Sequence, residues 1–364
     1  MSGYSNSLTQ LALQKFKKNF WGVFSFWIVV AIGLVSIFSY LISPDRSQNA
    51  NQMHLSIHSK KPGFKVQMLT IPSNIENQQS FVSKLFFGVN TTETEIPIAN
   101  HKVDDENLVV TEYASDGLEG MTKTIPLNLF PDQNYKKYIE EKTFIFGTDK
   151  YGRDYLSRIL IGSRISFFIG FIAVFISLVI GIFMGSLAGY FGGKVDAIIM
   201  WIINVTWSIP TLLLVIAITL VLGKGFWQVF IAVGLTMWVE VARVVRGQII
   251  SAKEMQYVTA ARALGFDDFR IITRHILPNI MAPVIVISAA NFAAAILIES
   301  GLSFLGIGAQ PPVASWGAMI KDHYNYIILG KPYLAVIPGL CIMILVMAFM
   351  LIGNALRDAL DVKG

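Results

Sequence analysis

Long apolar runs constrain this chain more than any other feature of its sequence. The runs from Ile165 to Tyr190 and from Ala197 to Leu222 contain no charged residue. Each exceeds the ~20 apolar residues with which a helix crosses the hydrocarbon core of a bilayer. Lipid offers the backbone no hydrogen-bond partner, so such runs are expected to be helical. Four further apolar runs span residues 21–42, 226–239, 281–308 and 334–353. We therefore predict an all-α polytopic membrane protein with six transmembrane helices.

Composition supports this class and excludes several kinds of chemistry. Hydrophobic residues make up 54% of the chain and charged residues 15%, against about 25% charged residues in soluble domains. The run 21–42 follows three lysines, but it is longer than the ~7–15 apolar residues of a secretory signal. We therefore predict a retained first helix. The single cysteine, Cys341, cannot form an internal disulfide, and no Cys/His cluster has the spacing of metal ligands. A metal pair at His54 and His58 is disfavoured because nothing predicts a helix there.

A polar segment separates the first apolar run from the second. Its fragments KVQMLTIP and ENLVVTEYA are typical of short strands, whereas NTTETE and YASDGLEG are typical of loops. We predict a small mixed insertion of unknown fold between the first two helices. The predicted organisation is a cytoplasmic tail with the first transmembrane helix (1–43), an extracytoplasmic insertion domain (44–143), and a five-helix core with a cytoplasmic loop at about 245–280 (144–364).

Lys and Arg in the short flanks predict the orientation, because these residues are enriched on the cytoplasmic side. The N-terminal tail carries lysines, and the C-terminal tail carries Arg357 and Lys363. The densest basic group lies between the fourth and fifth helices: Arg243, Arg246, Lys253, Arg262, Arg270 and Arg274. With six helices, these three flanks fall on one side. We predict that both termini are cytoplasmic and that the insertion is outside.

The basic stretch from Tyr257 to Asn279 is predicted to form two short helices joined at a turn. Gly265 stands where a helix C′ glycine is expected. Phe266 and Asp267 suit the N′ and N-cap positions of a second helix, with Ile271 placed to pack against Phe266. Pro278 is predicted to end that helix, and Tyr257, Ala261 and Leu264 are predicted to share a stripe.

Three hypotheses compete for this stretch. The first is an amphipathic hairpin that lies on anionic lipid, and the second is a helical knob docked in a groove of a cytoplasmic partner. The third, nucleic-acid binding, is excluded because the stretch lacks a recognition fold. Small residues at Ala260 and Ala261, a fixed turn and a charged rim favour the docked knob.

These residues carry a family resemblance. The sequence AARALGFDDFRIITRHILPN is similar to the EAA loop of permease subunits of ATP-binding-cassette (ABC) importers. In that loop Glu-Ala-Ala is followed by three residues, Gly, nine residues, Ile, one residue and Leu-Pro. The chain departs from this pattern at Thr259 and His275, as the oligopeptide and dipeptide branch does. FGTDKYGRDYLSRILIGSRIS, AGYFGGKVD, LSFLGIGAQPPVASWG and GNALRDALD also resemble that branch. The ATPase-coupling positions that the resemblance implies are Thr259, Ala260, Ala261, Gly265, His275, Leu277 and Pro278.

The resemblance implies the fold of a type I ABC importer permease in the bacterial cytoplasmic (inner) membrane. It implies a non-catalytic subunit of a peptide importer that works with a second homologous permease chain, two ATPase subunits and an extracytoplasmic substrate-binding protein, among membrane lipid. ATP and Mg²⁺ would be on the ATPase subunits, with no cofactor on this chain. The chain has no phosphate-binding loop of its own, because AGYFGGKV lacks the first glycine and the final Ser or Thr of that motif.

Polar residues within the apolar runs are candidates for the pathway or for bracing the bundle, because an ionisable or polar group in a membrane is costly. The candidates are Asn204, Ser208, Glu240, Asn291 and Glu299. Glu240 is predicted to pair with Arg243 as a structural contact. Pro210 is predicted to kink the third helix.

The external segments GTDKYGRD and QPPVASWG are predicted to dock the substrate-binding protein. The candidate docking residues are Asp149, Gly152, Arg153 and Asp154. Other functions stay open at this level. They are a permease for nickel chelates or another small solute, a secondary transporter working alone, and a membrane scaffold whose insertion carries the function. No inverted repeat or chain of buried charges favours the secondary transporter.

Overall fold

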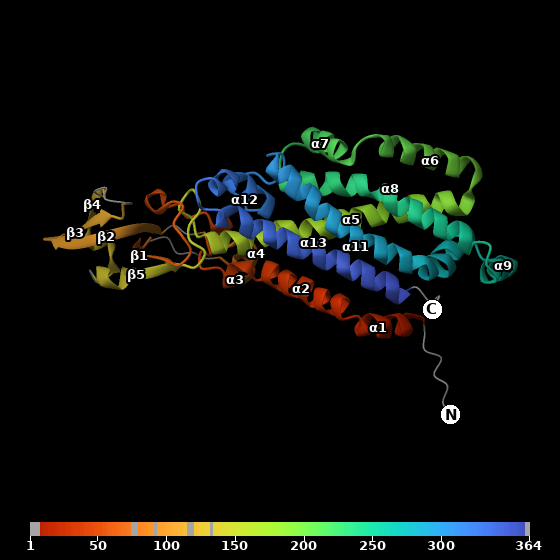
Figure 1. The fold of residues 1–364 in the computed structure, drawn as a ribbon, viewed down its shortest axis with the longest axis horizontal. Coiled ribbons are helices and arrows are strands. Elements are labelled where there is room, and N and C mark those ends of the chain that lie inside the picture. The colour runs from red at the N-terminus through yellow and green to blue at the C-terminus, as the bar shows by residue number, and fades with distance from the viewer. Residues whose placement is uncertain (1–7, 74–78, 91–92, 115–119, 132–133, 361–364) are drawn as a thin grey trace, which may run out of the picture. The chain divides into compact units, whose positions relative to one another are not determined.

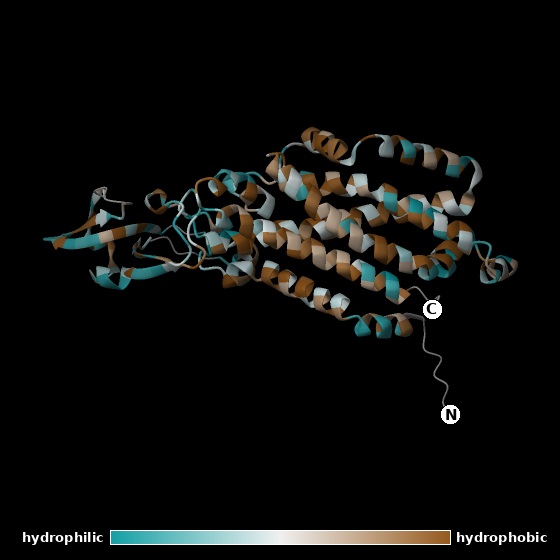
Figure 2. Cartoon of the chain, in the orientation of Figure 1, coloured by the Kyte–Doolittle hydropathy of each residue, from teal (hydrophilic) through white to brown (hydrophobic). Residues whose placement is uncertain are grey.

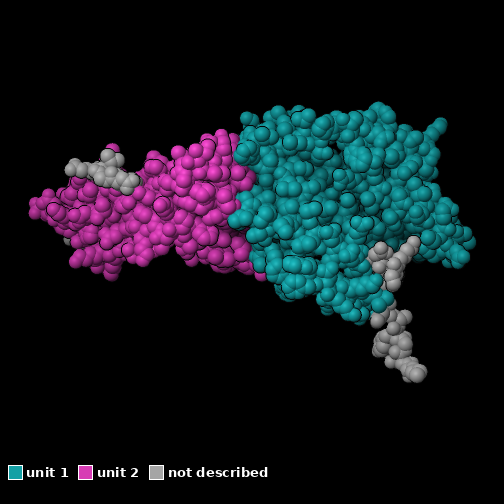
Figure 3. Space-filling view, viewed as in Figure 1, with its two compact units in different colours: residues 1–33, 166–310, 339–364 teal, residues 34–165, 311–338 magenta. Residues whose placement is uncertain are grey.

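The computed structural model describes residues 8–73, 79–90, 93–114, 120–131 and 134–360. The chain divides into two compact units (Figure 3). The first comprises residues 1–33, 166–310 and 339–364, and the second comprises residues 34–165 and 311–338. The insertion predicted at 44–143 lies within the second unit, which also takes in the residues on either side of it.

The first unit is helical, and its helices are rich in apolar residues (Figures 1 and 2). The helices that lie wholly or largely in it are α1 (Leu8–Lys18), α2 (Phe20–Ile37), α5 (Tyr155–Phe191), α6 (Gly193–Ser208), α7 (Thr211–Leu222), α8 (Phe226–Ala252), α9 (Gln256–Ala263), α10 (Asp268–Arg270), α11 (Leu277–Phe304) and α13 (Tyr333–Leu360). Within the described residues, five helical segments are long and apolar enough to span a membrane, or six if the bent pair α6 and α7 is one span. The chain is thus a multi-pass membrane protein.

The third predicted helix is broken, not merely kinked. α6 ends at Ser208, α7 begins at Thr211, and the two are bent by 94°. Proline disfavours helical geometry in the residue before it, and Ile209 is accordingly extended, with φ of −96° and ψ of 128°. Pro210 therefore predicts the site of the break.

Glycines at every fourth position bring α5 and α8 into close contact. A Cβ atom added at Gly181 would lie 2.5 Å from the Cβ of Val241, and one at Gly185 would lie 2.5 Å from the carbonyl oxygen of Ala242. At Gly189 the added atom would lie 2.8 Å from a backbone oxygen of α8. Small residues at this spacing allow membrane helices to approach backbone to backbone. The α5–α8 contact thus depends on this glycine ladder.

The second unit contains a five-stranded antiparallel sheet. Its strands are β1 (Phe64–Ile71), β2 (Thr94–Asp104), β3 (Asn107–Glu112), β4 (Thr122–Pro126) and β5 (Ile139–Phe144), in the order β4-β3-β2-β1-β5. The two strands predicted from KVQMLTIP and ENLVVTEYA correspond to β1 and β3. Alternate residues of β2 (Ile96 and Ile98) and of β3 (Leu108 and Val110) are buried in one cluster with Leu69 of β1, as a half-buried strand requires.

Among its described residues, the second unit also has three short α-helices: α3 (Ser39–Ile42), α4 (Phe81–Phe87) and α12 (Trp316–His323). α12 is fixed to the first turns of α5, because Trp316 Nε1 donates to the carbonyl of Ile159 at 3.0 Å. The Tyr155 hydroxyl likewise donates to the carbonyl of Leu334. Segments far apart in the sequence therefore meet around the start of α5.

Candidate functional site

The basic stretch forms α9, a glycine turn and the short α10. Gly265 follows the end of α9 with φ of +75°. Its amide donates to the carbonyl of Arg262 at 2.9 Å, and the amide of Phe266 donates to the carbonyl of Ala261 at 3.2 Å. This pair of bonds is the Schellman motif, in which glycine takes the left-handed conformation. The C′ position predicted for Gly265 is confirmed.

Local contacts fix the turn. The Asp267 carboxylate accepts a hydrogen bond from the amide of Arg270 at 3.1 Å, which is the geometry of the predicted N-cap. The Phe266 ring packs against the core cluster that contains Ile271, and it stacks on the His275 ring with centroids 5.5 Å apart. The Arg270 guanidinium lies 4.2 Å from the centroid of the same Phe266 ring. The turn therefore presents α9 in one defined orientation.

The second helix does not end at Pro278, contrary to the prediction. Residues Ile271–Ile276 form a π-helical turn that leads directly into α11. In an α-helix proline removes a hydrogen bond and clashes with the carbonyl four residues earlier. Here the amide of Leu277 bonds instead to the carbonyl of Ile272, five residues earlier, and Asn279 Nδ2 donates to the carbonyl of His275 at 2.7 Å. The loop and α11 therefore form one helical element.

The implied coupling positions divide into an inner and an outer set. Ala261 is 3% exposed and packs in the core cluster with Val258 and Ile271. Thr259, Ala260, Gly265 and Pro278 are exposed, and His275 and Leu277 are half-buried. Of the predicted stripe, Tyr257 and Ala261 lie four residues apart within α9 and so share a face, whereas Leu264 follows the last residue of the helix. Ala261 is the one buried residue of the three.

Three large apolar side chains are exposed on this loop. Leu264 is 72% exposed, Phe269 is 75% exposed and Tyr257 is 39% exposed. We call the surface formed by these three residues the α9–α10 knob. Soluble surfaces rarely gather apolar side chains without a partner, so the α9–α10 knob is suited to an apolar groove.

Two polar contacts lie near the loop: one joins it to α5, and the other joins α8 to α6. The Tyr190 hydroxyl, at the end of α5, donates to Asp268 of α10 at 2.6 Å, and the Arg262 guanidinium lies 5.4 Å from the centroid of the Tyr190 ring. Arg246 of α8 forms a two-pronged ion pair with Asp196 of α6, with N–O distances of 2.5 and 2.6 Å. Sequence reasoning missed both contacts. Their signal was the presence of isolated polar residues at the ends of apolar runs.

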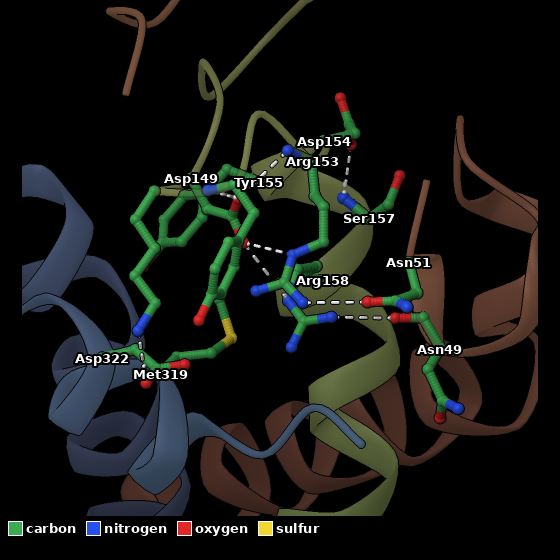
Figure 4. A network of polar contacts seen from close by, with 12 residues as sticks. Asn49, Asn51, Asp149, Arg153, Asp154, Tyr155, Ser157, Arg158, Met319 and Asp322 are labelled. Atoms are coloured by element: carbon green, nitrogen blue, oxygen red, sulfur yellow. Dashed lines mark hydrogen bonds and ion pairs between the residues drawn. The ribbon is translucent and has the colours of Figure 1, made fainter. Parts of the chain in front are cut away.

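A second cluster lies in the other unit, around the start of α5 (Figure 4). Asp149 is fully buried and accepts from Arg153 Nε at 2.6 Å, and its carboxylate lies 3.7 Å from Arg158 Nε. The two guanidinium groups also donate to Asn51 Oδ1 at 3.0 Å and to the carbonyl of Asn49 at 3.1 Å. One buried carboxylate thus holds two buried arginines, and these arginines in turn hold the segment after α3.

The burial of this cluster corrects the candidate docking residues. Arg153 is 3% exposed and Asp154 is 4% exposed. Gly152 is also buried, and a Cβ there would lie 1.8 Å from the carbonyl oxygen of His54. Asp154 accepts from the amide of Ser157 at 2.6 Å as a helix cap. These residues hold the unit together, so their side chains are not available to a docking protein.

Electrostatics around this cluster follow from burial and pairing. Lys150 pairs with Asp322 at 2.9 Å. Burial lowers the pKa of Lys150, but the hydrogen bond and charge of Asp322 outweigh it and raise the pKa. Burial lowers the pKa of His323 and raises the pKa of Asp154. In the sheet, burial raises the pKa of Glu95, but His54 and Lys142 together bring it down to about 2.

The polar residues of α6 and α8 do not pair as predicted. Among the described residues, no ion pair joins Glu240 and Arg243. Arg243 instead donates to Asn204 Oδ1 at 3.0 Å and lies 3.8 Å from the centroid of the Trp207 ring. Glu240, Asn204 and Ser208 are exposed on their helices. The predicted Glu240–Arg243 contact is therefore wrong.

The two polar candidates on α11 are buried. Glu299 is 1% exposed and accepts a hydrogen bond from the Ser303 hydroxyl at 2.7 Å, and that hydroxyl accepts from the amide of Ala309 at 3.1 Å. Glu299 thus braces the end of α11 and the turn after it. Asn291 is 2% exposed, and the next residue along α11, Phe292, stacks on Phe349 with ring centroids 4.6 Å apart.

Comparison with known proteins identifies the class. Residues 177–363 match the family described as binding-protein-dependent transport system inner membrane component. Residues 7–62 match the N-terminal transmembrane domain of oligopeptide transport permease C. The chain therefore belongs to the family of binding-protein-dependent inner membrane components, and its assignment to the ABC importer permeases of the oligopeptide and dipeptide branch is confirmed.

Individual relatives agree with this assignment. The dipeptide transport permease DppC of Bacillus subtilis is 43% identical over 218 residues, which cover 60% of this chain and 68% of that protein. The glutathione transport permease GsiD of Pectobacterium atrosepticum is 41% identical over 60% of this chain and 72% of its own. The oligopeptide transport permease OppC of Bacillus subtilis is 41% identical over 60% and 71%. A chain of the inward-facing MetNI methionine ABC transporter aligns with a TM-score of 0.46 and 18% identity, which is too distant a likeness to define the fold.

Proposed function

We propose that this chain forms half of the translocation pathway of an ATP-driven peptide importer. Its family is the inner membrane component of binding-protein-dependent transport systems. The relatives named above transport dipeptides, oligopeptides and glutathione, and all of these are short peptides. A peptide substrate is therefore the class that the comparisons support.

The α9–α10 knob is the observation that carries the mechanism. The apolar side chains of the knob are exposed, whereas Val258, Ala261 and Ile271 on the inner side of the same loop are buried in the core. The geometry suits a helix in a protein groove better than a hairpin on lipid. Arg262 and Arg270 lie over the rings of the chain's own Tyr190 and Phe266, so contacts within the chain already engage both guanidinium groups. We infer that the knob sits in a groove of an ATPase subunit.

The connections of the knob make it a coupling element. Its π-helical turn continues into α11, and the Tyr190–Asp268 hydrogen bond links it to α5. When ATP closes the ATPase subunits, a displacement of the knob is passed to both membrane helices. Thr259, Ala260 and Pro278 are the exposed coupling positions in this proposal, and Ala261 anchors the knob from inside. Coupling through such an element requires two states that both sites bias.

The remaining parts of the proposal concern the assembly. The chain would have six spans, with α6 and α7 as one broken span, and both termini in the cytoplasm of a bacterial cell. A second permease chain would complete the pathway, an extracytoplasmic binding protein would deliver the peptide, and two ATPase subunits would bind ATP and Mg²⁺. The exposed Asn204, Ser208 and Glu240 are the candidates to line the pathway.

Charge introduced on the knob tests the proposal. We expect Leu264→Glu and Phe269→Glu to abolish copurification of the ATPase subunits and uptake of a labelled dipeptide, because a buried unpaired carboxylate is costly in an apolar groove. Membrane insertion is expected to be unchanged, because both side chains are exposed. Phe269→Leu is the matched control and retains uptake. Full uptake by both Glu variants would refute the coupling role of the knob.

A further inference from the structure

The helix α4 in the second unit has an unusual surface. None of its residues is buried. Phe81 is 67% exposed, Val82 is 60% exposed, Phe86 is 44% exposed and Phe87 is 65% exposed. At 100° per residue, Phe81, Val82, Leu85 and Phe86 fall on one face of the helix. This surface is too apolar to be left in water.

Several contacts hold α4 firmly beside α3. The two helices pack against each other, and Arg164 Nη1 donates to the carbonyl of Phe86 at 2.8 Å. The Arg164 guanidinium also lies 5.0 Å from the centroid of the Tyr40 ring. Gly88 ends α4 with φ of +78°, where a Cβ would lie 2.8 Å from the Tyr40 ring. The next amide, of Val89, donates to the carbonyl of Arg46 at 2.8 Å.

Two independent features of the neighbouring helices give the depth of α4 along the membrane normal. α2 has 18 residues and is therefore about 27 Å long at 1.5 Å per residue, close to the ~30 Å of the hydrocarbon core. α3 begins just after α2 ends, so it lies at the edge of the hydrocarbon. Arg164 marks the same edge on α5, because it is the last charged residue before the apolar run that begins at Ile165. Since α4 contacts both α3 and Arg164, it lies at this boundary.

We propose that α4 lies in the outer lipid interface and anchors the insertion to the membrane surface. The helix packed beside it, α3, also exposes apolar side chains, with Leu41 39% exposed and Ile42 55% exposed. α4 has no acidic residue, and it carries Lys84, so nothing on it repels anionic headgroups. An interfacial helix buries its apolar face in the headgroup and acyl boundary in this way.

Site-directed fluorescence tests this proposal. Single cysteines are introduced as Val82→Cys and Phe86→Cys in a Cys341→Ala background and labelled with bimane. The full-length chain, with the subunits that purify with it, is placed in nanodiscs of phosphatidylcholine and phosphatidylglycerol. The matched control is Met121→Cys beside β4, where the side chain is 75% exposed. All three positions are exposed, so the label displaces no core residue, and equal elution profiles confirm equal folding.

We expect blue-shifted bimane emission at positions 82 and 86, with strong quenching by doxyl-labelled lipid and weak quenching by iodide. The label at position 121 is expected to show the reverse. If the labels at 82 and 86 are quenched by iodide as strongly as the control, the helix is in water and the proposal is overturned. Blue-shifted emission without doxyl quenching also overturns it, because a protein surface then covers α4 in place of lipid.

Discussion

The glycine ladder between α5 and α8 allows a quantitative test of how the bundle is held together. At Gly185 an added Cβ lies 2.5 Å from the carbonyl oxygen of Ala242 and 2.8 Å from the Cβ of Val245. Neither neighbour is the flexible end of a side chain, so Gly185→Ala forces the two helices apart. Overpacking of this kind costs about 1–3 kcal/mol.

A glycine elsewhere in α8 separates the packing cost from helix propensity. Gly247 lies in α8, and no atom packed against the helix there comes within 4 Å of an added Cβ. Replacing a helical glycine by alanine gains about 0.5–1 kcal/mol of backbone entropy in either variant. We therefore expect Gly247→Ala to be neutral or stabilising and Gly185→Ala to be destabilising. The difference between the two variants isolates the overpacking cost of about 1–3 kcal/mol.

The assay is reversible unfolding of the purified protein in mixed detergent micelles, followed by tryptophan fluorescence. The free energy of unfolding is compared among the parent protein, Gly185→Ala and Gly247→Ala at the same micelle composition. Equal stability of the two variants would show that α5 and α8 do not need the close approach. The reasoning from the glycine ladder would then be wrong.

Three further predictions follow from single sites. Space is open around Gly265, but Gly265→Ala is expected to cost about 1–2 kcal/mol because alanine is strained in the left-handed conformation, and coupled uptake of peptide falls. Gly265→Asn is the control and retains uptake, because Asn tolerates that conformation. Equal uptake by the two variants would contradict the prediction. His54 and Lys142 outweigh burial and lower the pKa of Glu95 in the folded protein to about 2. The Glu95 carboxylate therefore contributes fully to stability above its unfolded pKa of about 4.3, and this contribution is lost as the pH falls toward 2. Hydrogen exchange of β2 measures the loss, and Glu95→Gln should remove this pH dependence. Asp149→Asn leaves two buried arginines without their carboxylate, at a cost of about 3–5 kcal/mol, and a normal yield of folded protein in size-exclusion chromatography would refute its structural role.

Local signals in the sequence predicted the elements that local chemistry decides. The apolar runs predicted the membrane helices, because a helix in lipid must satisfy its own backbone. Gly265 and Asp267 predicted the turn before α10, because a C′ glycine and an N-cap carboxylate act within a few residues. Pro210 predicted the position at which α6 and α7 separate, although as a kink and not as the 94° break that the structure shows. Each of these signals is contained within one or two helical turns.

The local prediction failed where a neighbouring turn changed its context. Pro278 was expected to end a helix, but the π-helical turn before it removes the conflict with the preceding carbonyl. The predicted stripe of Tyr257, Ala261 and Leu264 holds only in part, because α9 ends at Ala263 and Leu264 lies beyond the helical period. Spacing also did not predict that Ala261 alone of the three is buried.

By itself, the sequence determined that this protein crosses a membrane several times, carries a helix–glycine–helix loop and belongs to the importer permeases. Only the tertiary structure decided which polar residues are buried and which residues they contact. Asp149 and Asp154 resembled surface residues in a polar loop, yet they fold inward to hold arginines and cap α5. Asp196 forms an ion pair with Arg246, which lies 50 positions further along the sequence. Such pairs depend on how distant helices approach one another, and no residue within a few positions of either partner specifies that approach.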